Sequence, residues 1–464
     1  MLRLKTWRWW GMVVVSVIAL AACGGPAATP TLAPVGLTVF APGTTVPVAN
    51  ASATAPAPAA SATLAPGQPT PTDVPVYGPD SFPPGINPLT GQAADPAVIN
   101  RMPIAAKIAN FPYGVRPQSG LGLADVVVEH LAEAGVTRFT AIFLEHDADK
   151  VGSIRSARFI DTEVAPMFGA MLVTSGSSLG TMAHLRQSPW FLGENVWRLV
   201  SEESRYVCPP LCRETPDDAN TLFTNTEALR AAVAAQAGST HVAQSGFAFT
   251  PAVPPGGTAV SEVRVDYSPA AHVSWRYNAA AGSYTRWQDK DPSLELIAHT
   301  DALTGEPITA DNVAVLFVNH QNNFVPEDFR DGGNCGLEIQ LWTIGPARIF
   351  RDGQFFDGRW HRDESTGWRL RLEDNNGNVI PLHPGKTWLG VVGLTADSSL
   401  SGATYLIHNR VLDTRTVCPI PPTETPTVTP EGWVDPNATV DPLATVDPFA
   451  TTNPFMVVTD TPAP

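Results

Sequence analysis

Two arginines, Arg155 and Arg158, are the side chains in this chain whose types and spacing could do chemistry. They follow an apolar run at 139–144, which is typical of a buried strand, and precede apolar residues at helical spacing over 159–167. Ser156 is a candidate N-cap for that helix. Guanidinium groups beside the free N–H groups of a helix N-terminus favour an anion or a carboxylate. The same arginines could instead brace the loop by pairing with acidic neighbours, and the sequence leaves both roles open.

A second strand, 170–174, and a second helix, 179–186, follow this stretch. The order strand, helix, strand, helix predicts a βαβ unit, in which the carboxyl ends of the strands meet at one edge of the sheet. We therefore expect the arginine loop to face the serines after 174, with Arg116 as a third arginine. The candidate ligand-binding residues are Arg116, Arg155, Ser156, Arg158, Ser175, Ser177 and Ser178.

Catalytic and metal sites are weaker alternatives. The segment 176–180 matches the Gly-x-Ser-x-Gly nucleophile pattern around Ser178, and His184 follows, but no acid partner is identifiable. His299, Asp301 and His320 could ligate a metal, although scattered polar residues after strands are usually loops. Residues resembling a calcium loop after Asp374 lack the required glycine and glutamate. The sequence therefore predicts neither a catalytic residue nor a cofactor.

The N-terminal residues predict export. Arg3, Lys5 and Arg8 precede a short apolar run at 11–20, and small residues lead to Cys23. This arrangement resembles the lipobox of bacterial lipoproteins, in which the cysteine thiol takes a diacylglyceryl group. We therefore expect residues 1–23 to hold a lipoprotein signal peptide, and the mature protein to be anchored to the membrane on its extracytoplasmic face. The net charge of −15 argues against nucleic acid as a partner.

Both ends of the chain have the composition of disordered segments. Residues 24–84 are rich in Ala, Thr and Pro and predict an extended stalk. Residues 419–464 contain a six-residue Asp-Pro repeat with no helical or strand period.

The remaining cysteines predict disulfides, because four cysteines in an exported chain are expected to pair. Three connectivities are open. The short spacing between Cys208 and Cys212 favours a local bridge, which leaves Cys335 to pair with Cys418. A zinc site would need a reducing compartment and a better spacing.

The folded part divides into two halves near residue 245. Residues 85–245 predict an α/β domain; within it, 126–129 and 136–144 form a hairpin in which Arg138 pairs with Glu129 or Glu133. Residues 246–418 predict a β-rich domain with hairpin turns at Asp352-Gly353 and Asn376-Gly377. Its expected strands are 263–267, 273–277, 284–287, 313–318, 338–342, 347–350, 368–372 and 389–392.

Several sequence blocks between residues 87 and 393 resemble the YerB-like bacterial lipoproteins, a family of uncharacterised function. In the first half the blocks are 87–91, 116–121 with Ala124, Asp125 and Glu129, 135–138 and 152–158. In the second half they are 358–360 with Arg362, and Asn376-Gly377 leading to 384–388. The resemblance implies two family domains on a lipid anchor and no established reaction. The family usually has Gly-Pro where this chain has Gly152-Ser153.

These observations favour a membrane-anchored lipoprotein that binds an anionic ligand or a protein partner. The alternatives are an envelope hydrolase or transferase that uses the same crevice, and a structural adaptor whose arginines are internal ties.

Overall fold

The structure is a computed structural model. The residues that it describes are 74–192, 198–202, 208–237, 245–327, 334–410 and 418. The predicted signal peptide with Cys23 and the repeat segment 419–464 lie outside these ranges, as does most of the stalk. The description begins inside the stalk, where Tyr77 pairs with Phe249 through backbone hydrogen bonds. Within the described ranges, no helix combines the length and apolar character that crossing a membrane requires.

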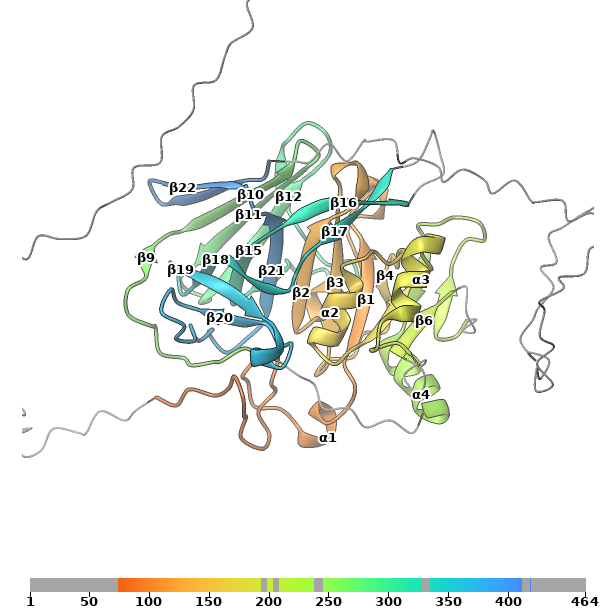
Figure 1. Cartoon of the computed structure of the whole chain (residues 1–464), viewed down its shortest axis with the longest axis horizontal. Helices are drawn as coiled ribbons and strands as arrows, with labels where there is room; N and C mark the ends of the chain where they lie inside the picture. The colour runs from red at the N-terminus through yellow and green to blue at the C-terminus, as the bar shows by residue number, and fades with distance from the viewer. Residues whose placement is uncertain are drawn as a thin grey trace, which may run out of the picture. The chain divides into compact units, whose positions relative to one another are not determined.

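A large mixed sheet organises the described residues, and both halves of the chain contribute strands to it (Figure 1). In spatial order its strands are β20 (Arg371–Glu373), β19 (Gln354–Arg362), β18 (Thr343–Arg351), β15 (Asn312–Val318), β21 (Thr387–Gly393), β2 (Val126–Leu131), β3 (Thr137–Phe143), β1 (Ile104–Ala109), β5 (Met171–Thr174) and β6 (Leu199–Ser201), with β9 (Thr258–Ala259) beside β19. The halves join where β21 runs parallel to β2, with Leu389 opposite Val128.

A second sheet comes from the second half of the chain. Its strands are β13 (Leu296–Ala298), β12 (Ser283–Asp289), β11 (Ala271–Asn278), β10 (Glu262–Ser268), β23 (Thr404–His408) and β22 (Asp397–Ser401), with β14 (Thr309–Ala310) beside β12. Aromatic rings pack it against the large sheet: Trp388 on β21 lies with its ring centroid 5.0 Å from Trp275 of β11 and 5.3 Å from Phe139 of β3. Burying rings of this size accounts for much of the adhesion between the two sheets.

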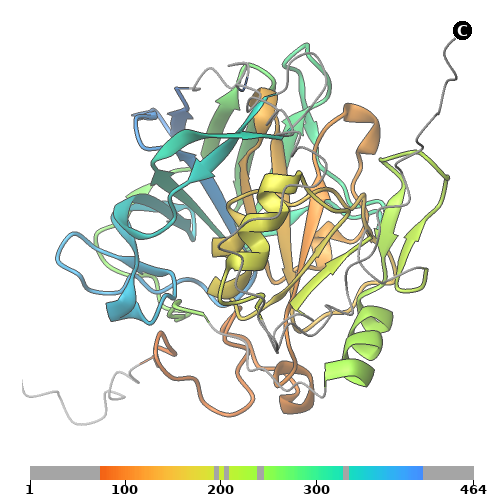
Figure 2. The ribbon, with the colours of Figure 1, turned by 45° about the vertical axis from the view of Figure 1, so that its right-hand side comes forward.

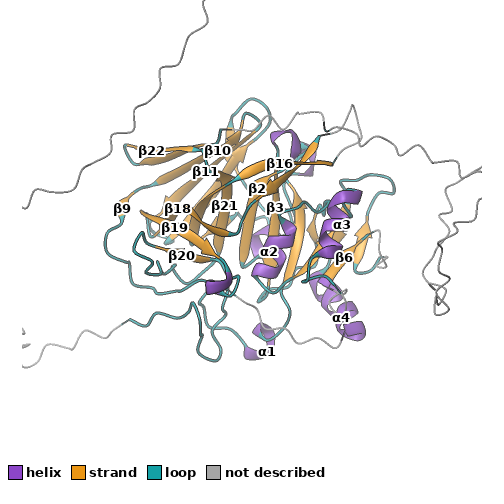
Figure 3. Cartoon of the chain, in the orientation of Figure 1, coloured by secondary structure: helices purple, strands orange, loops and turns teal. Residues whose placement is uncertain are grey.

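Helices cover the other face of the large sheet. Figures 1 and 2 show α2 (Asp161–Met167) and α3 (Leu179–Gln187) in front of its strands, and Figure 3 shows these helices in purple against the orange strands. The remaining elements are α1 (Pro96–Ile99), α4 (Thr226–Ala237), β4 (Val151–Gly152), β7 (Leu211–Arg213), β8 (Leu222–Thr224), β16 (His320–Pro326), β17 (Cys335–Ile339) and the 3-10 turns η1 (Tyr113–Val115), η2 (Leu121–Leu123), η3 (Glu133–Gly135) and η6 (Glu364–Thr366).

The predicted fold class is confirmed: an α/β first half with parallel strands is followed by a β-rich second half. The parallel βαβ unit, however, is β5–α3–β6. Strand β3 does not belong to it, because β3 runs antiparallel to β1, which in turn runs parallel to β5. After β3 the chain returns along residues 144–154, and Ile154 bridges to Ile108. This return brings the arginine loop to the carboxyl end of β1 and β5.

Two local predictions are wrong. Ser156 does not cap α2, because the helix begins at Asp161 with Ile160 in the N-cap position. Arg138 forms no ion pair with Glu129 or Glu133. In the hairpin register it lies opposite His130, while Glu129 lies opposite Phe139 and so points to the other face, and Glu133 pairs with Arg158 instead.

Most of the second half follows its local sequence signals, and both predicted disulfides are confirmed. Asp352 and Gly353 form the tight turn between β18 and β19, both with positive φ, as the Asp-Gly pair predicts. Cys208 is bonded to Cys212 and Cys335 to Cys418.

Candidate functional site

The arginine loop meets the end of β5, as the sequence predicts. The backbone N–H of Arg155 donates to the carbonyl of Lys107 on β1, and the N–H of Ser175 donates to the carbonyl of Arg155. The hydroxyl oxygens of Ser156 and Ser175 lie 3.4 Å apart. Strands β1 and β5 therefore hold Arg155, Ser156 and Ser175 together at one edge of the sheet.

Arg158 is buried and ion-paired. Its Nε donates to the Glu133 carboxylate at 2.6 Å, and its Nη1 lies 3.8 Å from Oε2 of Glu327. Burial alone would lower the pKa of Arg158. The attraction of the two carboxylates is larger than this effect of burial, so the pKa of the guanidinium is raised. Burial also raises the pKa of Glu327, against the pull of Arg158. Because Glu133 comes from the first half and Glu327 from the second, Arg158 ties the halves together.

Arg155 has a different environment. Its Nη1 donates to the carbonyl of Ala219 at 3.2 Å, and its buried Nε has no hydrogen-bond partner among the described residues. Burial, followed by repulsion from Arg158 and Arg213, lowers the pKa of Arg155. Within the described part, no carboxylate lies within ion-pair distance of it. Arg155 is thus a cation that a ligand could neutralise.

More positive charge lies beside this loop. Arg138 donates to the carbonyl of Ser156, and burial together with repulsion from Arg158 lowers its pKa to about 9. Lys107 is fully buried, where it donates to Asp161 at 2.8 Å. Burial lowers the pKa of Lys107 to about 8 and that of its neighbour His130 well below the ordinary range. The neutral imidazole of His130 can therefore accept from the Lys107 ammonium.

The other candidate residues, Arg116, Ser177 and Ser178, are not all close to Arg155. Arg116 donates to both the backbone and the side chain of Asn110 and of Asp289, and its guanidinium lies 4.8 Å from the Tyr113 ring centre. It braces the first half against β12. Ser177 donates to the carbonyl of Ser178 on the loop that enters α3.

Ser178 serves as the N-cap of α3, where its hydroxyl accepts from the N–H of Thr181. The imidazole of His184 lies elsewhere: it stacks on Phe159 at 4.5 Å, with Nε2 3.4 Å from the Thr162 hydroxyl. Among the described residues, no hydrogen bond links Ser178 to a histidine. The nucleophile pattern is therefore accounted for by helix capping.

A charged network that the sequence did not predict lies on the opposite face of the sheet. Nη2 of Arg286 on β12 donates to both carboxylate oxygens of Glu129 at 2.9 Å, and both side chains are fully buried. Trp388 and Thr137 also donate to Glu129. Nη1 of Arg286 donates to His299. The available signal was that Glu129 and Trp388 both belong to the blocks that carry the family resemblance.

In the described part, the group of side chains that could hold a metal ion is Asp125, Glu145 and His146, whose ligand atoms all lie within 4.8 Å of one another. Asp125 is already engaged: it accepts from the N–H groups of Leu144 and Glu145 and from the amide of Asn87. These hydrogen bonds indicate that Asp125 stabilises the turn after β3. The alternative metal ligands His299 and Asp301 are likewise committed, to Arg286 and to the backbone of the 120–122 loop.

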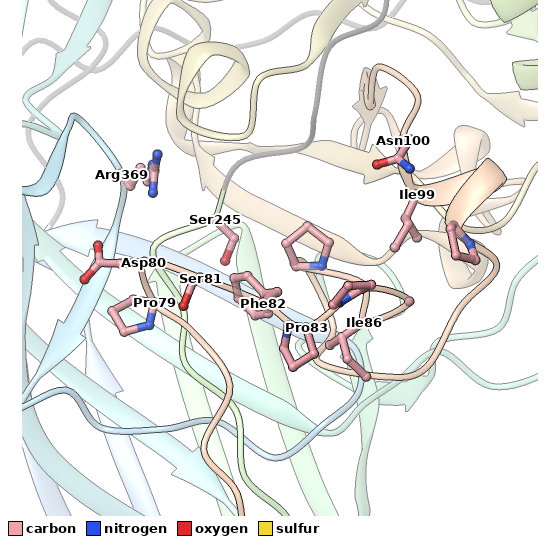
Figure 4. A pocket seen from close by; sticks show the side chains of 14 residues that line it. Pro79, Asp80, Ser81, Phe82, Pro83, Ile86, Ile99, Asn100, Ser245 and Arg369 are labelled. Atoms are coloured by element: carbon pink, nitrogen blue, oxygen red, sulfur yellow. The ribbon is translucent and has the colours of Figure 1, made fainter.

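A cavity of about 450 Å³ lies beside the segment 79–100 (Figure 4). Figure 4 shows Asp80 and Arg369 at one side of it and Ile86 and Ile99 at the other. Prolines and short polar side chains form most of the remaining wall. Asp80 is paired with Arg371, whereas the buried Nε of Arg369 has no hydrogen-bond partner among the described residues.

Comparison with known proteins places this architecture in a family. Residues 89–240 match the N-terminal domain, and residues 263–389 the C-terminal domain, of the family described as "Protein of unknown function (DUF3048)". The chain is 28% identical over 315 residues to the "Putative lipoprotein YerB" of Bacillus subtilis (strain 168), which covers 66% of this chain and 85% of that protein. The crystal structure of YerB from Bacillus subtilis superposes with a TM-score of 0.52 at 27% identity, covering 66% of this chain and 95% of that one. The chain therefore belongs to the DUF3048 family, and it carries both domains of that family.

Proposed function

We propose that this protein is an extracytoplasmic lipoprotein, anchored through Cys23, that binds an anionic group of a ligand or protein partner at Arg155. The relative named as a lipoprotein supports the anchor. The observation that carries the binding proposal is the environment of Arg155: its Nε is buried without a partner among the described residues, and repulsion from Arg158 and Arg213 outweighs the attraction of Asp218. An anion there would supply the missing acceptor and offset the repulsion.

Neighbouring groups support a polar ligand at this position. Ser156 follows Arg155 in the chain, the N–H of Ser175 donates to the carbonyl of Arg155, and the loop of Ser177 enters α3 at its N-terminal end. Helix N-termini and hydroxyl groups favour anions such as phosphate or carboxylate. Arg158 acts in this proposal as a brace that keeps the loop in place, because its guanidinium is engaged by Glu133.

The test compares Arg155→Ala with Arg158→Ala by thermal unfolding, in sulfate or phosphate and in chloride at matched ionic strength. A specific anion stabilises a folded state that binds it, and the increment grows with concentration above Kd. We expect Arg155→Ala to unfold near the wild-type temperature and to lose the anion increment. We expect Arg158→Ala to unfold at a lower temperature because Glu133 is left buried without its partner.

Arg276→Ala serves as the control, since Arg276 is a half-exposed arginine of the second sheet. It should keep both the wild-type stability and the anion increment. An anion increment of unchanged size in Arg155→Ala would refute the binding role and favour the structural adaptor.

A further inference from the structure

A separate cavity of about 320 Å³ lies between α2 and α3 on one side and β17 with its following loop on the other. Four ring-bearing side chains line it: Phe159, His184, Trp342 and Trp368. Ligand pockets commonly reach this size and combine aromatic walls with a few polar groups. Arg155 does not line this cavity, so it is distinct from the anion site proposed above.

Trp368 is held outward at the edge of the cavity. The residue is 53% exposed, and its backbone has φ 60°, in the left-handed region that a tryptophan seldom adopts. The sequence predicts a strand over 368–372, yet β20 begins only at Arg371. Two hydrogen bonds fix the backbone of Trp368: its N–H donates to the carbonyl of Asp363, and its carbonyl accepts from Nε of Arg362. The fold thus maintains an exposed aromatic surface in a strained conformation, a combination that points to function.

Trp342 shows a related arrangement. It is half-buried at the end of the loop after β17, and the next residue, Thr343, has φ 73°. A β-branched residue in the left-handed region is a genuine outlier. Across the cavity, Phe159 stacks on His184 with an interplanar angle of 17°, which fixes the orientation of the imidazole. Aromatic surfaces from both halves of the chain therefore line one cavity.

The charged side chains that line this cavity are two carboxylates, Glu163 and Glu338, which disfavour an anionic ligand. Arg362 is almost fully buried, donates to the Glu163 carboxylate and to the carbonyl of Leu341, and lies 5.7 Å from the ring centre of Trp368. Because these contacts occupy the guanidinium, it is poorly placed to bind an anion. A cationic ligand on Trp368 would meet the positive charge of Arg362. The carboxylate of Glu338, bonded to Gln321 at 3.3 Å, remains as an acceptor.

The ligand that fits is neutral, has an apolar ring face for the tryptophans, and has hydroxyl donors for the carboxylates, which only accept. A pyranose ring has this chemistry. We propose that this cavity binds a neutral sugar, with Trp342 and Trp368 contacting the ring face and Glu338 accepting from its hydroxyls.

The experiment titrates the full-length protein, in a detergent without a sugar headgroup, with methyl glucoside, N-acetylglucosamine, maltotriose and cellotriose. Intrinsic tryptophan fluorescence and calorimetry report binding. We expect saturable binding of at least one of these sugars. Trp342→Ala and Trp368→Ala should each weaken it about tenfold, the equivalent of one aromatic contact. Glu338→Gln, which preserves the shape of the side chain, should weaken it about fivefold through the lost charge-assisted hydrogen bond.

Trp287→Ala is the matched control, since Trp287 is a partly exposed tryptophan of β12 under Arg276 and does not line the cavity. It should bind sugar as the wild type does. If Trp368→Ala fails to fold, Trp342→Ala and Glu338→Gln still decide the outcome. The proposal is overturned if no sugar binds at millimolar concentration, or if binding survives in these variants. It is also overturned if tetramethylammonium binds in place of sugars and the same variants abolish that binding.

Discussion

The buried pair of Glu129 and Arg286 allows a quantitative test of how the two halves are held together. Both side chains have no exposed surface, and Arg286 lies 4.8 Å from the ring centre of Trp388. The pair links β2 in the first half to β12 in the second. Replacing Arg286 with Met keeps much of the apolar volume but leaves the Glu129 carboxylate buried among neutral donors, which include Thr137 and Trp388.

The expected cost follows from that unpaired charge. Removing one member of a buried ion pair typically costs about 3–5 kcal/mol, because the remaining ion keeps its desolvation penalty without the attraction. Arg286→Met and Glu129→Gln should each lower the free energy of unfolding by about that amount. The double variant should lose about 1–3 kcal/mol less than the sum of the two, since neither charge is then left alone.

The assay is equilibrium unfolding in urea with both disulfides intact, followed by circular dichroism and tryptophan fluorescence. Arg276→Met is the matched control. Arg276 lies in the neighbouring strand β11 with its side chain 44% exposed, and its Nε is 3.6 Å from Glu262, so its loss should cost at most about 1 kcal/mol. If Arg286→Met were no more destabilising than Arg276→Met, or if the single effects added without coupling, the buried pair would not hold the halves together.

Three further predictions concern the anchor, a disulfide and pH. Cys23→Ser should abolish labelling by a fatty-acid analogue and release the protein from membranes; labelling that persists would refute the lipid anchor. Reducing the Cys335–Cys418 bridge, whose cysteines are 83 residues apart, should lower the free energy of unfolding by about 3–5 kcal/mol, and no change would contradict that. The hydrogen bond to Asp266 raises the pKa of His272, so this contact stabilises the fold below the ordinary histidine pKa and is lost as the pH rises through the raised value. His272→Gln should therefore destabilise the protein at about pH 5.5 and much less at about pH 9; an equal loss at both would exclude a titrating contact.

Local signals in the sequence predicted much of the fold because they act over a few residues. Apolar runs and turn chemistry locate the β2–β3 hairpin, α3 and the Asp352-Gly353 turn. Pairing between distant segments has no such local signal. The position of β21 beside β2 and the approach of Glu327 to Arg158 depend on how the two halves pack, and no spacing rule contains that information.

The blocks that carry the family resemblance mostly contain bracing residues. Asn87 donates to Asp125, Trp388 donates to Glu129, and Arg362 donates to Glu163. Each of these contacts joins distant segments of the chain. The family resemblance therefore predicts the residues that stabilise the fold. Trp342 and Trp368, which we propose to contact sugar, lie outside those blocks.

The arginine loop shows how the backbone separates two neighbouring candidate residues. The sequence predicts that Arg155 and Arg158 both lie beside the N-terminus of one helix, where they could meet the same ligand. Here α2 begins only at Asp161, so both arginines lie in the non-helical segment before it. Their side chains diverge: Arg158 reaches Glu133, whereas Arg155 approaches Ala219 and keeps an unsatisfied Nε within the described part. In the proposed site an anion would contact Arg155, while Arg158 keeps the loop in place. Arg155→Ala should therefore lose anion binding, and Arg158→Ala should lose stability.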